Sequence, residues 1–273
     1  MRINEIFKSI DGEGCRTGAP TIFVRFAGCN LRCEYCDTPY ALEGSQGNPE
    51  YDTLSKVMDR LNAMLPDRLI DKSFINFTFT GGEPLLHQDD ILMILEALHG
   101  YHPDLSFSIN IETNGSIDPK DFIRKYTGTS FARAKDGVLP VNELFFTFDI
   151  KTASAGKKAM EACFKDDSTF RLKFIQDPLD YDTLTTSVYR KNVIKAVVGS
   201  IEELDWVKRV LTYHSIEANI NLTELYDVYI SPVYGKIDPR EIVNYIINNS
   251  ECNGWKAQVQ LHKIIWDPDT TGV

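Results

Sequence analysis

A short loop with three cysteines carries the chemistry that this sequence offers most clearly. Cys29, Cys33 and Cys36 follow the spacing Cys-x3-Cys-x2-Cys. A structural zinc site is tetrahedral and closed, and an ordinary [4Fe–4S] cluster has one cysteine on each iron. Three thiolates would leave one iron of such a cluster open to a substrate or cofactor. The spacing therefore predicts a redox-catalytic iron–sulfur site.

The alternative is a structural zinc site whose fourth ligand comes from elsewhere in the fold. Cys15 is close in sequence, but Cys163 and Cys252 are isolated, and no second Cys-x2-Cys pair or His pair follows at zinc-finger spacing. Disulfides are not favoured, because a chain of 273 residues can bury a large core without cross-links. We interpret these three cysteines as ordinary thiols.

The composition is that of a globular protein, with 43% hydrophobic and 25% charged residues. A net charge of −10 argues against a general nucleic-acid surface, which needs clustered Lys and Arg. The first eight residues lack the apolar core of a signal peptide, and no run of 18 apolar residues occurs. We expect a cytoplasmic protein without a membrane span.

The scaffold around these residues is predicted to alternate strands with helices, which indicates a mainly parallel sheet. The predicted strands are Thr21–Ala27, Phe74–Thr80, Phe107–Glu112, Leu144–Ile150, Asn192–Val198 and Asp227–Ile230. The clearest predicted helices are Thr53–Met64, Gln88–Leu98, Pro119–Lys125, Ile201–Tyr213 and Pro239–Ile247. About six βα units predict a partial, open α/β barrel. We expect one domain over residues 1–273, with Thr152–Arg190 as a possible insertion that includes an extra strand near Phe170.

Unusual residues gather where the predicted strands end. The cysteine loop follows the first strand, and the later strand ends carry Thr80–Pro84, Glu112–Gly115, Asp149–Lys151 and Ser231–Tyr234. Parallel α/β sheets build their ligand sites at the carboxyl ends of the strands. The sequence therefore predicts one site at this rim.

These motifs resemble those of a known family. The cysteine loop followed by Gly81-Gly82-Glu83-Pro84 is similar to the radical S-adenosylmethionine (SAM) superfamily. A longer ordered series resembles the 7-carboxy-7-deazaguanine synthase family within it: Ser9–Gly14, Phe23–Leu31, Cys36–Thr38, Thr80–Pro84, Glu112–Ser116, Asp149–Lys151 and Gln260–Lys263. The series spans nearly the whole chain.

The resemblance implies a lyase that holds a [4Fe–4S] cluster on Cys29, Cys33 and Cys36, with SAM chelating the free iron. Reductive cleavage of SAM would give a 5′-deoxyadenosyl radical. In the family this radical takes a hydrogen from C6 of 6-carboxy-5,6,7,8-tetrahydropterin. The ring contracts, ammonia is lost, 7-carboxy-7-deazaguanine forms and SAM is regenerated. The product feeds 7-deazapurines of tRNA such as queuosine and archaeosine.

The resemblance also implies the residues that bind each ligand. For SAM they are Gly82, Asp149, Ile150, Lys151, Ser231, Pro232, Val233 and Tyr234. For the substrate they are Ile10, Asp11, Gly12, Arg25 and Thr80. Thr38 matches the Mg²⁺ ligand, with substrate oxygens and water completing the octahedron.

Two of these residues deserve separate comment. The guanidinium of Arg25 suits the pterin carboxylate, and the alternative is an ordinary salt bridge. Asp11 stands where the family usually has glutamine, which changes the side-chain chemistry at this substrate position.

Partners are implied in the same way. The resemblance suggests a small-molecule pterin substrate, an external one-electron reductant such as a flavodoxin or ferredoxin, and a homodimer, with no nucleic-acid or membrane partner. Two alternatives stay open: an activase of glycyl radical enzymes, which uses a similar cysteine spacing, and a non-catalytic zinc-binding module.

Overall fold

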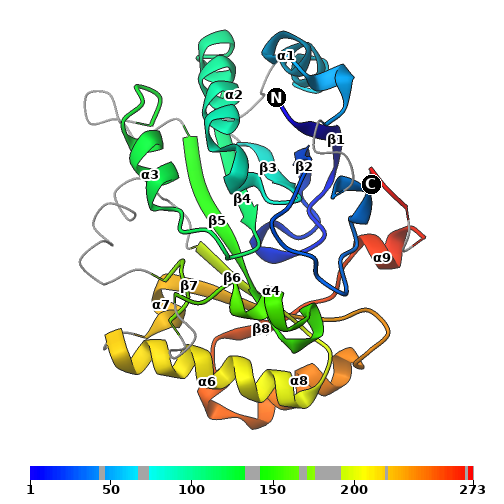
Figure 1. Cartoon of the computed structure of the whole chain (residues 1–273), viewed down its shortest axis with the longest axis vertical. Coiled ribbons are helices and arrows are strands. Elements are labelled where there is room, and N and C mark those ends of the chain that lie inside the picture. The colour runs from blue at the N-terminus through cyan, green and yellow to red at the C-terminus, as the bar shows by residue number, and fades with distance from the viewer. Residues whose placement is uncertain are drawn as a thin grey trace.

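The computed structural model describes residues 1–42, 47–66, 74–132, 142–165, 171–175, 192–218, 221–267 and 270–272. Within these residues the strands form one sheet in chain order from β1 to β8 (Figure 1). The strands are β1 Ile3–Ile10, β2 Pro20–Phe26, β3 Ile75–Gly81, β4 Phe107–Thr113, β5 Asn142–Lys151, β6 Asn192–Val198, β7 Tyr226–Pro232 and β8 Trp255–Ala257.

The sheet is almost entirely parallel and remains open. β1 pairs antiparallel with β2, and every later neighbour pairs in parallel. β1 and β8 form its two edges in the described chain. The expected partial, open α/β barrel is therefore confirmed, with a helix after each strand from β2 to β7.

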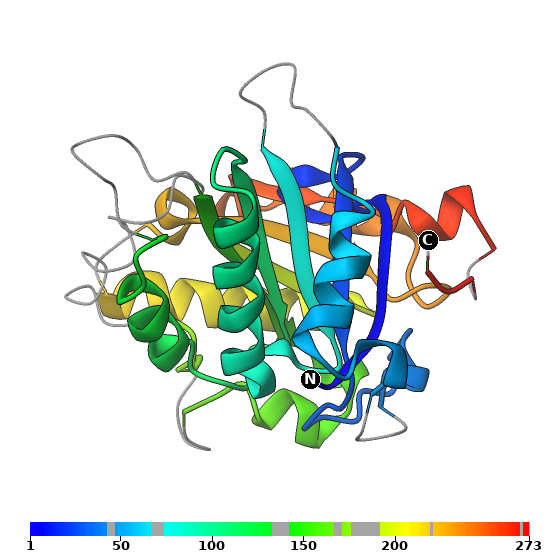
Figure 2. The same ribbon diagram turned by 90° about the horizontal axis from the view of Figure 1, so that it is seen from above.

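The helices are α1 Leu54–Asn62, α2 Gln88–Tyr101, α3 Lys120–Thr127, α4 Lys157–Glu161, α6 Ile201–Ala218, α7 Leu222–Leu225, α8 Pro239–Asn248 and α9 His262–Ile265. The longer helices pack on the outer side of the curved sheet, whereas α4 packs on the cysteine loop and α9 borders the internal cavity (Figure 1). α1 and α2 lie side by side (Figure 2). Local sequence starts several of them: the Thr53 hydroxyl accepts from Lys56 N, and Asp238 caps α8 ahead of Pro239. None of the described helices is long and apolar enough to cross a membrane.

Strand periodicity explains why the sheet has an apolar outer face and a polar inner face. In β4, Phe107, Ile109 and Ile111 are at most 1% exposed and belong to the core beneath the helices. The alternate residues Asn110 and Glu112 line an internal cavity. Because side chains of a strand alternate between faces, one sequence supplies both the core and the site.

The predicted elements and the observed ones agree within a few residues, and the described chain adds the strands β1 and β8 and the short helices α4, α7 and α9. β1 and β8 were not predicted: β8 is only three residues long, and β1 lies before the first motif as an antiparallel partner of β2. In the possible insertion, the described residues form the turn Ala153–Ala155, α4 and an isolated bridge between Phe164 and Leu172. Phe170 and residues 176–190 lie outside the described residues.

Candidate active site

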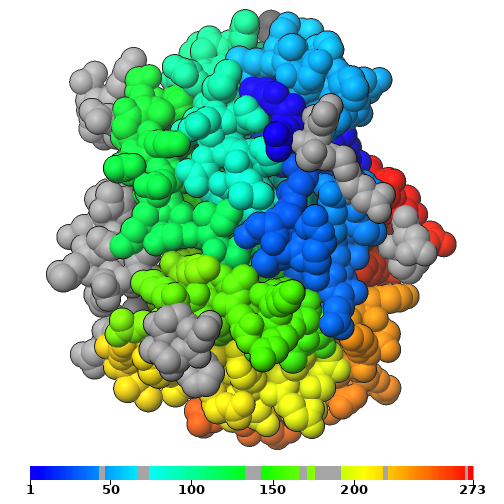
Figure 3. Space-filling model, viewed as in Figure 1, coloured from blue at the N-terminus to red at the C-terminus, as the bar shows by residue number. Residues whose placement is uncertain are grey.

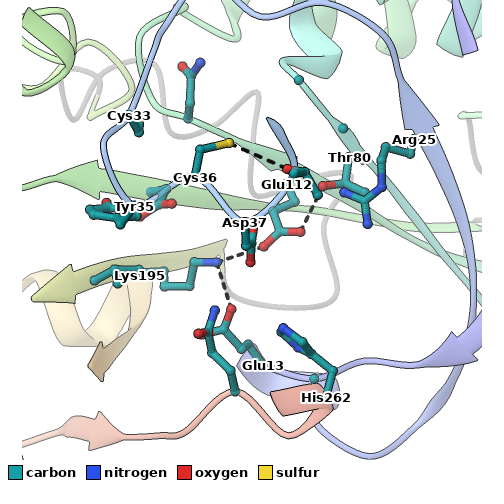
Figure 4. Close-up of a pocket in the computed structure, with 18 of the residues that line it drawn as sticks. Glu13, Arg25, Cys33, Tyr35, Cys36, Asp37, Thr80, Glu112, Lys195 and His262 are labelled. Carbon is teal, nitrogen blue, oxygen red and sulfur yellow. Dashed lines mark hydrogen bonds and ion pairs between the residues drawn. The ribbon is translucent and has the colours of Figure 1, made fainter. Parts of the chain in front are cut away.

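The carboxyl ends of the parallel strands surround a cavity of about 950 Å³ (Figure 4). This volume is at the upper end of the range for pockets that hold small organic ligands. All three cysteines of the loop line it, together with side chains from β2 to β6. The structure thus brings together the rim residues that are far apart in sequence.

The cysteine loop is anchored at its start by the glycine pair after β3. Gly82 N donates to Phe26 O and Glu83 N donates to Gly28 O, both at 3.0 Å. A Cβ on Gly82 would lie 1.9 Å from the Gly28 oxygen. Close backbone approach of the two loops therefore requires glycine here.

The outer side of the loop packs on the region of α4. Leu31 contacts Ala155 and Ala159 in a small apolar cluster that also includes Cys29 and Cys33. Glu34 N donates to Ala155 O at 3.2 Å. In the space-filling view the loop and the α4 region lie side by side on one face (Figure 3).

A fully buried carboxylate joins this loop to the end of β4. Glu83 accepts hydrogen bonds from Leu85 N at 2.9 Å, the Thr113 hydroxyl at 2.8 Å and Asn114 N at 2.7 Å. Burial raises the pKa of Glu83 to about 6, against the effect of these hydrogen bonds. The Asn114 amide in turn donates to Cys29 Sγ at 3.5 Å. Glu83 and Asn114 therefore set the position of the first cysteine.

The three thiols fit an iron–sulfur cluster with one open iron. Cys29, Cys33 and Cys36 are partly exposed free thiols, whereas Cys163 and Cys252 are buried. Among the described residues, no three His, Cys, Asp or Glu side chains form a group that could hold a metal ion. A cubane does not require such convergence, because each thiolate binds a different iron. Burial raises the pKa of Cys29 and raises that of Cys33 to about 11, so a strongly cationic partner is needed to hold the thiolates.

Beside the cysteines lies a polar wall with unsatisfied atoms. Lys151 Nζ pairs with Asp149 Oδ2 at 2.6 Å and lies 5.6 Å from the centre of the Tyr35 ring. Asp149 Oδ1 and the Tyr35 hydroxyl are buried without a hydrogen-bond partner among the described residues. Buried polar atoms are nearly always paired, so these two atoms point to a polar ligand at this wall.

Next to this wall, on the neighbouring strand β6, begins a linked set of charges (Figure 4). Lys195 Nζ lies 2.9 Å from Glu112 Oε1 and 3.2 Å from Glu13 Oε2. The Thr80 hydroxyl donates to Glu112 Oε2 at 3.1 Å. Burial alone would raise the pKa of Glu112, but the Lys195 ammonium and the Thr80 hydroxyl lower it to about 2. Glu112 is therefore an ionised acceptor that faces the cavity.

Asp11 is engaged below this wall in a buried ion pair. Its carboxylate lies 2.9 Å from Arg16 Nε and accepts from the Thr21 hydroxyl at 2.8 Å. Arg16 also donates to the backbone oxygens of Ser108 and Phe77. The replacement of the usual glutamine by aspartate thus coincides with a buried cation beside it.

Most of the predicted site residues line the cavity, and three do not. Those that line it beyond the cysteines are Ile10, Asp11, Gly12, Arg25, Thr38, Thr80, Gly82, Asp149, Lys151, Val233 and Tyr234. Ile150 and Pro232 are buried behind the wall. Ser231 is also fully buried, and its hydroxyl donates to Glu13 Oε1 at 2.7 Å, so it reaches the cavity only through Glu13.

Sequence reasoning missed Lys195 and Glu13. Lys195 is a single charge inside the apolar strand Asn-Val-Ile-Lys-Ala-Val-Val, the same signal that singled out Arg25 in β2. Glu13 stands within a matched motif but received no role of its own. A rule that an isolated charge in a buried strand must have a partner would have found Lys195.

Comparisons with known proteins identify the family and the fold. A family model described as a 4Fe-4S single cluster domain matches residues 10–133. A 7-carboxy-7-deazaguanine synthase of Clostridium acetobutylicum is 34% identical over 100% of this chain and 99% of that protein. One of Methanospirillum hungatei is 29% identical over 98% of this chain and 86% of that protein. The crystal structure of QueE from Escherichia coli shares the fold, with a TM-score of 0.53 and 19% identity over 94% of this chain and 92% of that one.

Proposed function

The chain belongs to the 7-carboxy-7-deazaguanine synthase family of radical SAM enzymes, and on that premise we propose that it converts 6-carboxy-5,6,7,8-tetrahydropterin into 7-carboxy-7-deazaguanine with loss of ammonia. The observation that carries the proposal is the shared cavity. Three thiols for an open cluster line one side of it, and a cationic anchor and an ionised acceptor line the other. A cofactor and a small heterocycle could therefore meet in it.

Cys29, Cys33 and Cys36 would hold the [4Fe–4S] cluster, which together with SAM supplies the one-electron chemistry that activates a carbon–hydrogen bond. The polar wall of Lys151, Asp149 and Tyr35 suits the polar groups of SAM, because two of its buried atoms lack partners. Gly82, Val233 and Tyr234 border the same space. Ile150 and Pro232 are buried behind the cavity lining, and Ser231 reaches the cavity through Glu13.

The substrate would bind between Arg25 and Glu112. The Arg25 guanidinium suits the pterin carboxylate. Glu112, held ionised by Lys195, offers an acceptor to the nitrogen–hydrogen groups of the ring. Ile10, Asp11, Gly12 and Thr80 complete the wall. The Asp11 side chain pairs with Arg16, and its backbone N–H and C=O form hydrogen bonds with Ala19 and Gly18, so Asp11 would contact the substrate by packing.

The remaining assignments extend the family pattern. Thr38 lines the cavity beside the cysteines and would bind Mg²⁺ together with substrate oxygens and water. A flavodoxin or ferredoxin would deliver electrons, and two chains would form a homodimer in the cytoplasm. The product would serve queuosine, archaeosine or another 7-deazapurine.

An anaerobic turnover assay tests the proposal. Protein reconstituted with iron and sulfide is incubated with 6-carboxytetrahydropterin, SAM, Mg²⁺ and dithionite, and the products are identified by mass spectrometry. We expect 7-carboxy-7-deazaguanine from the wild type and none from Cys33→Ala. Absence of this product from wild-type protein with a verified cluster would refute the proposed reaction.

A further inference from the structure

The guanidinium of Arg25 is held along one edge by a carboxylate of the neighbouring strand. Glu5 lies opposite Arg25 in the β1–β2 register. Arg25 Nε and Glu5 Oε1 are 2.6 Å apart, and the side chains are only 15% and 22% exposed. The hydroxyl of Tyr40 donates to the same Glu5 oxygen at 2.8 Å. Glu5 is thus fixed from two sides and fixes Arg25 in turn.

One face of the Arg25 guanidinium lies over an aromatic ring. The guanidinium carbon of Arg25 lies 5.7 Å from the centre of the Phe7 ring. Phe7 is itself stacked on Phe23, with 5.0 Å between ring centres. Edge and face contacts together restrict a side chain that otherwise has many rotamers and loses that freedom when it binds a ligand.

These contacts leave a defined edge for a ligand. A guanidinium can bind a carboxylate through its two terminal nitrogens or through Nε and one terminal nitrogen. Glu5 already occupies Nε. We propose that Glu5 is a positioning residue that makes Arg25 present its two terminal nitrogens to the substrate carboxylate. This inference rests on the proposed function, in which Arg25 binds that carboxylate.

Glu5 does not line the cavity, so its effect on ligands would pass through Arg25. Its removal also deletes a negative charge near an anionic ligand, which by itself would favour binding. The two effects can be separated by comparing Glu5→Gln with Glu5→Ala. Both variants lose the charge, but only the glutamine keeps an oxygen that can accept from Nε.

The test is a fluorescence titration of reconstituted protein with SAM and without reductant. The ligands are 6-carboxypterin and 6-methylpterin, which lacks the carboxylate. Asp121→Asn is the matched control, because Asp121 pairs with Arg124 at an exposed site. We expect Glu5→Ala to bind 6-carboxypterin about tenfold more weakly than Glu5→Gln. All variants should bind 6-methylpterin alike.

Two results would overturn the role of Glu5: equal affinity of the alanine and glutamine variants for 6-carboxypterin, or equal weakening for both pterins, which would indicate a general structural role. A different result would overturn the role of Arg25 in the proposed function. In that case the wild type would bind 6-carboxypterin no more tightly than 6-methylpterin.

Discussion

Lys195 is the residue whose charge decides the electrostatics of the substrate wall. Its ammonium is 8% exposed and lies between Glu13 and Glu112. Without this cation, burial would raise the pKa of Glu112 above its ordinary value. The ionised state of Glu112 therefore depends on Lys195.

Replacing Lys195 by methionine is expected to lower the free energy of unfolding at pH 8 by about 3 kcal/mol, because it leaves two partly buried carboxylates without their partner. The measurement is urea unfolding. The exposed residue Lys158 offers a control, since Lys158→Met should change the stability by less than about 0.5 kcal/mol.

The same variant should reverse the pH dependence of stability. In the wild type the folded-state pKa of Glu112, about 2, lies below its ordinary value of 4.5. Its ionisation therefore stabilises the fold above about pH 4.5, and this stabilisation is lost as the pH falls toward 2. In Lys195→Met burial should raise the pKa of the unpaired Glu112 above its ordinary value, so the variant should gain stability from pH 8 to pH 5. A stability gap that stays constant over this range would contradict this account of Lys195.

The substitution Glu83→Gln tests whether the hydrogen bonds that this buried carboxylate accepts behind the cysteine loop stabilise the fold. All three of its hydrogen bonds are accepted, so in Glu83→Gln the new amide would direct a donor at another donor. We expect the free energy of unfolding, measured by calorimetry, to fall by about 1–3 kcal/mol. Glu96→Gln on the exposed side of α2 should leave the melting temperature unchanged. An unchanged melting temperature for Glu83→Gln as well would show that the carboxylate is not required there.

At the scale of elements, the loop after β3 and the cysteine loop form one unit. Gly82→Ala would force the Gly28 backbone away, because the new Cβ would lie 1.9 Å from its oxygen. We expect this variant to keep its fold but to lose most of the iron that reconstitution introduces, as measured by metal analysis.

Gly100→Ala in α2 is the matched control for that substitution. No neighbouring atom lies within 4 Å of a Cβ there. Alanine should leave the iron content unchanged and stabilise the helix by up to about 1 kcal/mol. Equal iron content in both variants would show that the two loops need not approach closely.

The fold was largely predictable because its signals are local. Runs such as Phe-Thr-Phe-Thr-Gly and Phe-Ser-Ile-Asn-Ile-Glu mark β3 and β4, and Asp238 with Pro239 marks the start of α8. β8 escaped prediction because three residues carry no periodicity. β1 was missed because its strand character depends on pairing with β2.

The site was less predictable because its partners are distant in sequence. The cysteine spacing and the Gly81-Gly82 turn are local, and the structure places them together. The pairing of Lys195 with Glu13, 182 residues apart, depends on the curvature of the sheet. The same holds for Asp11, whose buried partner Arg16 could not be inferred from the motif that contains it.

At the scale of the whole molecule, the open sheet places an apolar core outside and a charged cavity inside. Although the net charge of the chain is −10, cationic side chains line the cavity, among them Arg25, Lys151 and Lys195. This arrangement would hold cofactor and substrate in one enclosed space. We therefore expect a hydrogen atom to pass directly from the substrate to the cofactor.

The most direct test follows the hydrogen at C6 of the substrate. Reconstituted protein is given SAM, reductant and 6-carboxytetrahydropterin deuterated at C6 under anaerobic conditions, and mass spectrometry locates the label. We expect deuterium in the recovered SAM, because substrate and cofactor would lie in the same cavity and the C6 hydrogen would pass directly between them. Formation of 7-carboxy-7-deazaguanine while SAM stays unlabelled and the deuterium appears in water would contradict it.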